Sequence, residues 1–241
     1  MAKSADDIAA ILFDKDGTLI GYDASWGPVN RELAAIAACG DAQLADRLLL
    51  ACGMDPVSGH VTPDSLLAAG NTAQIAAGLI AAGSPCDVAE LTQRLDRLFT
   101  EAASKSVPVT DLKALFARLK QRGYRLGIAS SDNEASIRET ALRFGIEQDL
   151  DFIAGYDSGH GTKPQPGMVL GFCEAIGLAP VRVAVVGDNN HDLHMARNAK
   201  AGLAIAVLTG TGTRDSLSVD CDYCLDDITG LETLLSPRAA L

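Results

Sequence analysis

The chain has 241 residues, of which 48% are hydrophobic and 21% charged, and this composition excludes an intrinsically disordered protein. Its 20 basic and 31 acidic residues give a formal net charge of −11. Such a charge is poorly suited to the phosphates of nucleic acids or to an anionic membrane, so we expect no nucleic acid and no membrane as partner.

Apolar runs along the chain predict the buried strands of a parallel sheet. The strongest cover residues 8–13, 124–129, 182–186 and 203–207, with a weaker one at 152–154. Helix-like stretches lie between them. One covers residues 111–122, and another opens with the capping-box pattern of residues 131–134 and runs towards Phe144. This alternation predicts an α/β fold, a doubly wound parallel sheet with a Rossmann-like core.

Residues 21–105 interrupt the alternation. They contain no strand-like run, whereas alanine and leucine recur at helical spacing and turn-forming clusters separate the helices. We therefore predict an all-α helical domain of residues 21–105, inserted after the first strand. The α/β core is then formed by residues 1–20 and 106–241.

Polar side chains follow the predicted strands at their carboxyl ends, where open parallel sheets bind ligands. They are Asp14 and Asp16 after the first strand, Ser130 and Ser131 after the second, Lys163 in a proline-flanked loop, and Asp188 and Asp192 after the fourth. Clustered carboxylates repel one another unless a hard cation such as Mg²⁺ lies between them. One carboxylate can attack phosphorus, another can move the proton, and a hydroxyl and a lysine can hold phosphoryl oxygens. This set suits phosphoryl transfer.

The sequence resembles the haloacid dehalogenase superfamily, in its phosphatase branch. Four motifs of that superfamily occur in order: D-x-D-G-T at residues 14–18, a serine at Ser130, the lysine of a K-P-x-P loop at Lys163, and G-D-x-x-x-D at residues 187–192. A helical insertion between the first two motifs matches the cap of the C1 subclass. Through the cap position and the run of residues 207–213, the chain most resembles phosphoglycolate phosphatase-like proteins.

The resemblance implies roles for the residues that match the motifs. Asp14 would be the nucleophile that forms an aspartyl-phosphate, and Asp16 would be the general acid and base. Ser130, Ser131 and Lys163 would bind the phosphoryl group of the substrate. The cap is expected to open and close over the core through linkers near residues 21–24 and 104–108.

The resemblance also implies Mg²⁺ as the cofactor. Its ligands would be Asp14, Asp188 and the backbone carbonyl of Asp16. Thr18 and Asp192 would lie behind these ligands and support them. Asp192 would assist the metal or orient Lys163. We expect the side chain of Lys15 to point away from the site, because side chains alternate along a strand. The resemblance gives His191 no fixed role.

Hydrolysis of a small phosphate monoester, either phosphoglycolate-like or a small sugar phosphate, is the leading functional hypothesis. Dehalogenases lack the second aspartate that is present here as Asp16, and a phosphonate-cleaving enzyme needs a cap lysine, which residues 22–104 do not contain. A phosphomutase and a non-catalytic phosphometabolite-binding protein stay open as alternative functions.

A carboxylated substrate would need a cap cation, and the candidates are Arg31, Arg47, Arg94, Arg97 and Lys105. Trp26 and residues 58–60 are further candidates for substrate contact.

The remaining features favour a cytoplasmic protein, either a monomer or a homodimer. The N-terminal residues carry charges where a secretory signal needs an apolar run. The six cysteines are scattered, which favours reduced thiols, and no second pair completes a zinc site with Cys221 and Cys224. The uncharged stretch of residues 65–86 is broken by glycines and polar residues, so we interpret it as buried helix.

Overall fold

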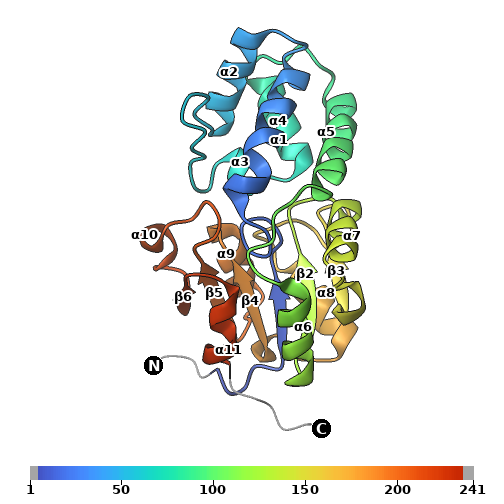
Figure 1. The fold of residues 1–241 in the computed structure, drawn as a ribbon, viewed down its shortest axis with the longest axis vertical. Coiled ribbons are helices and arrows are strands. Elements are labelled where there is room, and N and C mark those ends of the chain that lie inside the picture. The colour runs from blue at the N-terminus through green and yellow to red at the C-terminus, as the bar shows by residue number, and fades with distance from the viewer. Residues whose placement is uncertain (1–4, 236–241) are drawn as a thin grey trace.

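The computed structural model describes residues 5–235, which form a parallel sheet with a layer of helices above one end (Figure 1). The sheet has six strands in the order β3-β2-β1-β4-β5-β6, and every neighbouring pair is parallel. The strands are β1 (Ala10–Phe13), β2 (Arg125–Ala129), β3 (Phe152–Ala154), β4 (Val183–Gly187), β5 (Leu203–Val207) and β6 (Tyr223–Leu225). The strand order reverses at β1, so the prediction of a doubly wound sheet is confirmed.

Burial on both faces explains why the central strands are readable as apolar runs. All residues of β1, β4 and β5 are buried, and all five predicted strands occur within two residues of their expected bounds. The sixth strand, β6, was not predicted, because its three half-buried residues are too short a run to stand out in the sequence. This strand contains Cys224, which is a free thiol, as is Cys221.

Helices cover both faces of the sheet. They are α6 (Leu112–Gln121), α7 (Glu134–Arg143), α8 (Gly167–Ile176), α9 (Asn190–Asn198), α10 (Arg214–Leu217) and α11 (Leu231–Leu234), with 3-10 turns at Glu147–Asp149, Pro180–Arg182 and Ile228–Gly230. Alternate residues of β1 divide between two hydrophobic clusters. Ile11 and Phe13 pack with α6, α7 and α11, whereas Ala10 and Leu12 pack with α8, α9 and α10.

The start of α7 differs from the prediction. Its N-cap is Asn133, whose side chain accepts a hydrogen bond from the backbone N–H of Ser136 at 2.9 Å. The capping box predicted for residues 131–134 is therefore wrong. Ser131 does not cap this helix, because its hydroxyl donates to the backbone carbonyl of Ala69 at 3.2 Å.

Five helices are inserted between β1 and α6 and lie above the carboxyl ends of the strands (Figure 1). They are α1 (Tyr22–Ala37), α2 (Ala42–Cys52), α3 (Leu66–Ala69), α4 (Thr72–Ala81) and α5 (Val88–Ala103). They enclose their own hydrophobic cluster, in which Leu33, Leu48 and Leu95 are completely buried. The all-α insertion is thus confirmed, while its exact limits at residues 21 and 105 stay a prediction.

The two connections between the helical layer and the sheet run side by side. The backbone N–H of Gly21 donates to the carbonyl of Val107 at 2.9 Å, and the N–H of Val107 donates to the hydroxyl of Ser25 at 3.1 Å. These bonds join the segments predicted as linkers.

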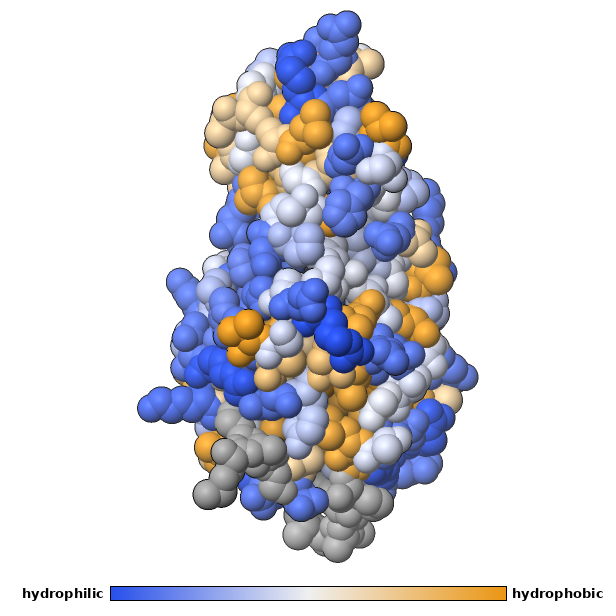
Figure 2. All heavy atoms as spheres, turned by 90° about the vertical axis from the view of Figure 1, so that its left-hand side faces the viewer, coloured by the Kyte–Doolittle hydropathy of each residue, from blue (hydrophilic) through white to orange (hydrophobic). Residues whose placement is uncertain are grey.

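Within residues 5–235, no helix combines the length and the apolar character that crossing a membrane requires. The uncharged stretch of residues 65–86 is divided between α3 and α4 instead. Figure 2 shows hydrophilic side chains across the face turned to the viewer, over both the helical layer and the sheet, with the hydrophobic ones in separate groups.

Candidate active site

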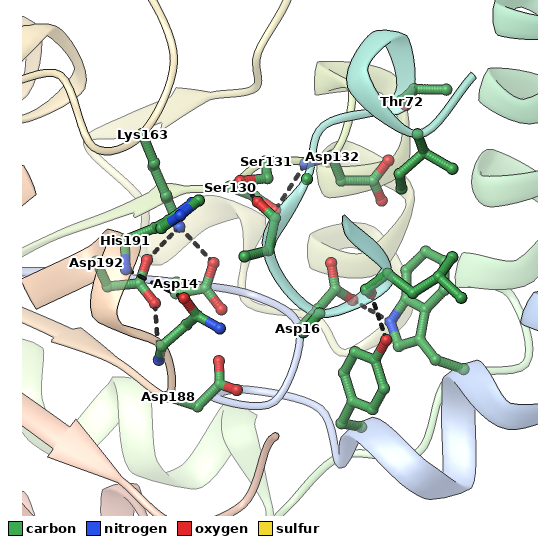
Figure 3. Close-up of a pocket in the computed structure, with 18 of the residues that line it drawn as sticks. Asp14, Asp16, Thr72, Ser130, Ser131, Asp132, Lys163, Asp188, His191 and Asp192 are labelled. Carbon is green, nitrogen blue, oxygen red and sulfur yellow. Dashed lines mark hydrogen bonds and ion pairs between the residues drawn. The ribbon is translucent and has the colours of Figure 1, made fainter. Parts of the chain in front are cut away.

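A cleft lies between the carboxyl ends of the strands and the helical layer (Figure 3). It contains about 580 Å³ of space, part of which is open to solvent. Seven of the predicted site residues line it: Asp14, Asp16, Ser130, Ser131, Lys163, Asp188 and Asp192. Side chains from four separate segments of the core therefore meet at one place.

Lys163 lies between two carboxylates (Figure 3). Its Nζ is 2.5 Å from Asp14 Oδ1 and 2.6 Å from Asp192 Oδ1, and all three residues are buried. Burial lowers the pKa of the ammonium, but the two carboxylates raise it more, so Lys163 is a fixed cation. Burial raises the pKa of the Asp14 carboxyl to about 6, although Lys163 acts in the opposite direction. Lys163 can therefore hold anionic oxygens beside Asp14.

Asp188 adds a third carboxylate to this cluster. One oxygen each of Asp14, Asp188 and Asp192 lies within 4.8 Å of the others, and all three residues are buried. Burial raises the pKa of Asp188 well above its usual value, and the carboxylates of Asp14 and Asp192 raise it further. A divalent cation would relieve this repulsion, and three carboxylates are ligands that Mg²⁺ prefers. The donor set therefore fits the implied metal.

The turn after β1 is shaped to admit Asp188. Gly17 has a φ of +83°, and a Cβ at this position would lie 2.6 Å from the Asp188 carboxylate. Any larger residue would be both strained in this conformation and in collision with the acid. The backbone N–H of Thr211 donates to Asp188 Oδ2 at 2.9 Å and fixes its orientation.

Asp16 belongs to a second, separate group of charges. Its Oδ1 accepts hydrogen bonds from Lys15 Nζ at 2.8 Å and from the indole N–H of Trp26 at 2.7 Å. Lys15 Nζ is also 3.0 Å from Asp132 Oδ2 and 5.6 Å from the centre of the Trp26 ring. The expectation that Lys15 points away from the site is wrong. Strand alternation does not apply to it, because β1 ends at Phe13 and the chain is already turning.

The remaining predicted residues surround these charges. Ser130 is buried, and its Oγ accepts a hydrogen bond from the backbone N–H of Asp132 at 3.1 Å. Thr18 is completely buried and does not line the cleft, in keeping with a supporting position. His191, for which the sequence predicted no role, lines the cleft, and burial lowers the pKa of its imidazole.

Sequence reasoning missed most of the wall contributed by the helical layer. Trp26 was a candidate and does line the cleft, whereas Tyr22, Ile75 and Phe99 were not identified. Their spacing within each helix is that of ordinary core residues, so no local signal in the sequence could have distinguished them from residues of the hydrophobic core. The loop of residues 58–60 does not line this cleft, because it borders a different depression beside Met54.

Comparisons with known proteins give relatives over most of the chain. Phosphoglycolate phosphatase of Pasteurella multocida is 29% identical over 133 residues, which are 54% of this chain and 58% of that protein. N-acetylmuramic acid 6-phosphate phosphatase of Pseudomonas aeruginosa is 26% identical over 194 residues, which are 80% of this chain and 78% of that protein. The crystal structure of CbbY from Rhodobacter sphaeroides in complex with phosphate has a TM-score of 0.69 at 20% identity, covering 93% of this chain and 96% of that one.

These comparisons differ in what they establish. The likeness to CbbY is a likeness of fold, and the chain spans about half the length of the first curated relatives that it matches. The family model of the haloacid dehalogenase-like hydrolases, however, matches residues 8–200, which extend from the first strand through the helical layer to the end of α9. This protein therefore belongs to the haloacid dehalogenase-like hydrolases.

Proposed function

We propose that the protein is a Mg²⁺-dependent phosphatase that hydrolyses a small phosphate monoester through an aspartyl-phosphate on Asp14. The observation that carries this proposal is the position of Asp14. It lies at the carboxyl end of the central strand β1, beside the Lys163 ammonium and within the carboxylate cluster. Two of the relatives described above are named as phosphatases of small phosphate esters, which supports the same reaction class.

In the proposed first step, a carboxylate oxygen of Asp14 forms a bond to phosphorus while the bond from phosphorus to the leaving alcohol breaks. Asp16 gives its proton to the leaving oxygen. Lys163 and the Ser130 hydroxyl hold the other phosphoryl oxygens during the transfer. Burial raises the pKa of Asp16 to about 6, nearer to neutrality than an ordinary aspartate, as a group that gives and takes a proton requires.

In the second step, Asp16 takes a proton from a water molecule, whose oxygen attacks the phosphorus. The bond between phosphorus and Asp14 breaks, phosphate leaves, and the carboxylate is restored. Asp14 and Asp188, with the backbone carbonyl of Asp16, would hold Mg²⁺. When bound, this ion neutralises the charge of the phosphoryl group and of the carboxylates.

We further propose that residues 21–105 act as a cap that must open for substrate to enter. Several hydrogen bonds hold the helical layer on the core beside the cleft, among them the bond from Ser131 to Ala69 described above. Asn190 Nδ2 donates to Asp64 at 2.9 Å, the Tyr156 hydroxyl donates to Asp96 at 3.0 Å, and the Trp26 indole donates to Asp16. With these contacts formed, the cap covers Asp14 and excludes bulk water from the reaction.

The test is phosphate release from a panel of small phosphate esters with Mg²⁺ and with EDTA. We expect release from at least one ester with Mg²⁺, loss of release with EDTA, and recovery when Mg²⁺ is added in excess. Release that EDTA leaves unchanged would contradict the metal requirement. With folded protein and Mg²⁺ present, a complete lack of release would contradict the phosphatase and favour a phosphomutase or a binding protein, which product analysis of a sugar phosphate would separate.

A further inference from the structure

The half of the cleft that faces the helical layer is mostly apolar, and its polar side chains are those of Asn30 and Thr72. Aromatic side chains reach it from α1 and α5, and aliphatic ones from α3 and α4. They are Tyr22, Trp26, Leu67, Ala68, Ile75 and Phe99. Trp26 packs edge-on against Phe99, with ring centres 4.9 Å apart. This wall lies opposite Asp14, so it surrounds the part of a substrate that leaves.

The polar atoms of the aromatic side chains in this wall already have protein partners. The Tyr22 hydroxyl donates to the backbone carbonyl of Leu67 at 2.5 Å, and the Trp26 indole N–H donates to Asp16 at 2.7 Å. Neither group is free to bind an anion. The aromatic rings therefore present their apolar carbon surface to the cleft.

No cation from the helical layer reaches the cleft within residues 5–235. Lys163 is the one lysine or arginine among the described residues that line it, and its ammonium lies between Asp14 and Asp192. His191 also lines the cleft, but it comes from α9 of the core and not from the helical layer. A carboxylate on the leaving group would lose its hydration without gaining a counter-charge.

The basic residues of the helical layer point elsewhere. Arg31 donates to the backbone carbonyl of Pro56 at 2.8 Å on an exposed face, and Arg94 borders a groove beside Cys39. Arg47, Arg97 and Lys105 are exposed. The carboxyl groups beside the wall, Asp16 and Asp132, share the Lys15 ammonium, which does not itself line the cleft.

We propose that the leaving group of the substrate is an uncharged alcohol with an apolar face, and that phosphate esters with a carboxylate are poor substrates. This inference rests on the proposed phosphatase function. It chooses between the two substrate types that the sequence leaves open. It also separates this chain from the Pasteurella multocida relative, because phosphoglycolate carries a carboxylate on its leaving group.

Two matched pairs of esters test the proposal, each differing only in CH₂OH against COO⁻. They are 2-hydroxyethyl phosphate against phosphoglycolate, and glycerol 3-phosphate against 3-phosphoglycerate. We expect kcat/KM for each acid to be at least about tenfold lower than for its neutral partner. Acids that are hydrolysed as fast as their partners would overturn this inference alone. No hydrolysis of any of the four, or of p-nitrophenyl phosphate, would overturn it together with the phosphatase proposal.

A variant adds the missing charge. Ala68 is half-buried in the wall, so Ala68→Lys can place an ammonium in the cleft, and Ala68→Met is the neutral control of similar length. We expect Ala68→Lys to raise the ratio of kcat/KM for acid over neutral ester at least about fivefold, and Ala68→Met to leave it unchanged. If both variants change the ratio alike, electrostatics does not set the preference. The wild-type ratio decides the proposal even if Ala68→Lys does not fold.

Discussion

Asp14→Asn is expected to lower kcat for phosphate release by at least about three orders of magnitude, as losses of a catalytic nucleophile do. The amide is a poor nucleophile, and it is also a weaker ligand for a divalent cation. The protein should stay folded, because the buried carboxylate of Asp14 is costly to ionise and Lys163 keeps its contact with Asp192. The measurement is phosphate release with Mg²⁺, with circular dichroism to check the fold.

Asp46→Asn provides a matched control, because it is the same chemical change at an exposed position of α2. Its kcat should equal that of the wild type within experimental error. An Asp14→Asn variant that keeps wild-type turnover would eliminate the aspartyl-phosphate mechanism. Equal losses in both variants would point to a defect in folding.

Lys15→Met is expected to lower the free energy of unfolding by about 3–5 kcal/mol, the usual loss when one partner of a buried ion pair is removed. Lys15 is only 1% exposed, and its ammonium is the shared partner of Asp16 and Asp132. Without the Lys15 ammonium, the carboxylates of Asp16 and Asp132 lie close together with little access to water. Urea unfolding followed by circular dichroism measures the loss.

A second substitution separates charge from packing in this variant. Adding Asp132→Asn removes one of the two unpaired charges, so the double variant should be more stable than Lys15→Met alone. Lys113→Met, on the exposed side of α6, is the control and should change stability by less than about 0.5 kcal/mol. If Lys15→Met unfolds at the same urea concentration as this control, the buried cation has no stabilising role.

The sheet and the core half of the site could be predicted because their signals are local. A strand that is buried on both faces must be apolar throughout, and parallel strands bring their carboxyl ends to one edge. Asp14, Ser130 and Asp188 follow such strands, so their convergence could be inferred from order alone. The weakest element, β6, lacks this burial and was missed.

The other half of the site depends on contacts that no local pattern encodes. Tyr22, Ile75 and Phe99 come from three helices and meet only after the helical layer has packed on the core. The partnership of Lys15 with Asp132 links positions more than a hundred residues apart. The expected direction of the Lys15 side chain was wrong for a different reason. Strand geometry was applied to a residue beyond the end of its strand.

The fluorescence of Trp26 reports on the surroundings of its indole ring. Trp26 is the one tryptophan of the chain, so tryptophan emission comes from a single known place. In the structure its N–H is bonded to Asp16, and the Lys15 ammonium lies 5.6 Å from its ring. Movement of α1 away from the core would remove both partners and let water reach the ring, which shifts the emission to longer wavelength. The proposed closing of the cap over a ligand could thus be timed in a stopped-flow fluorimeter without attaching a dye.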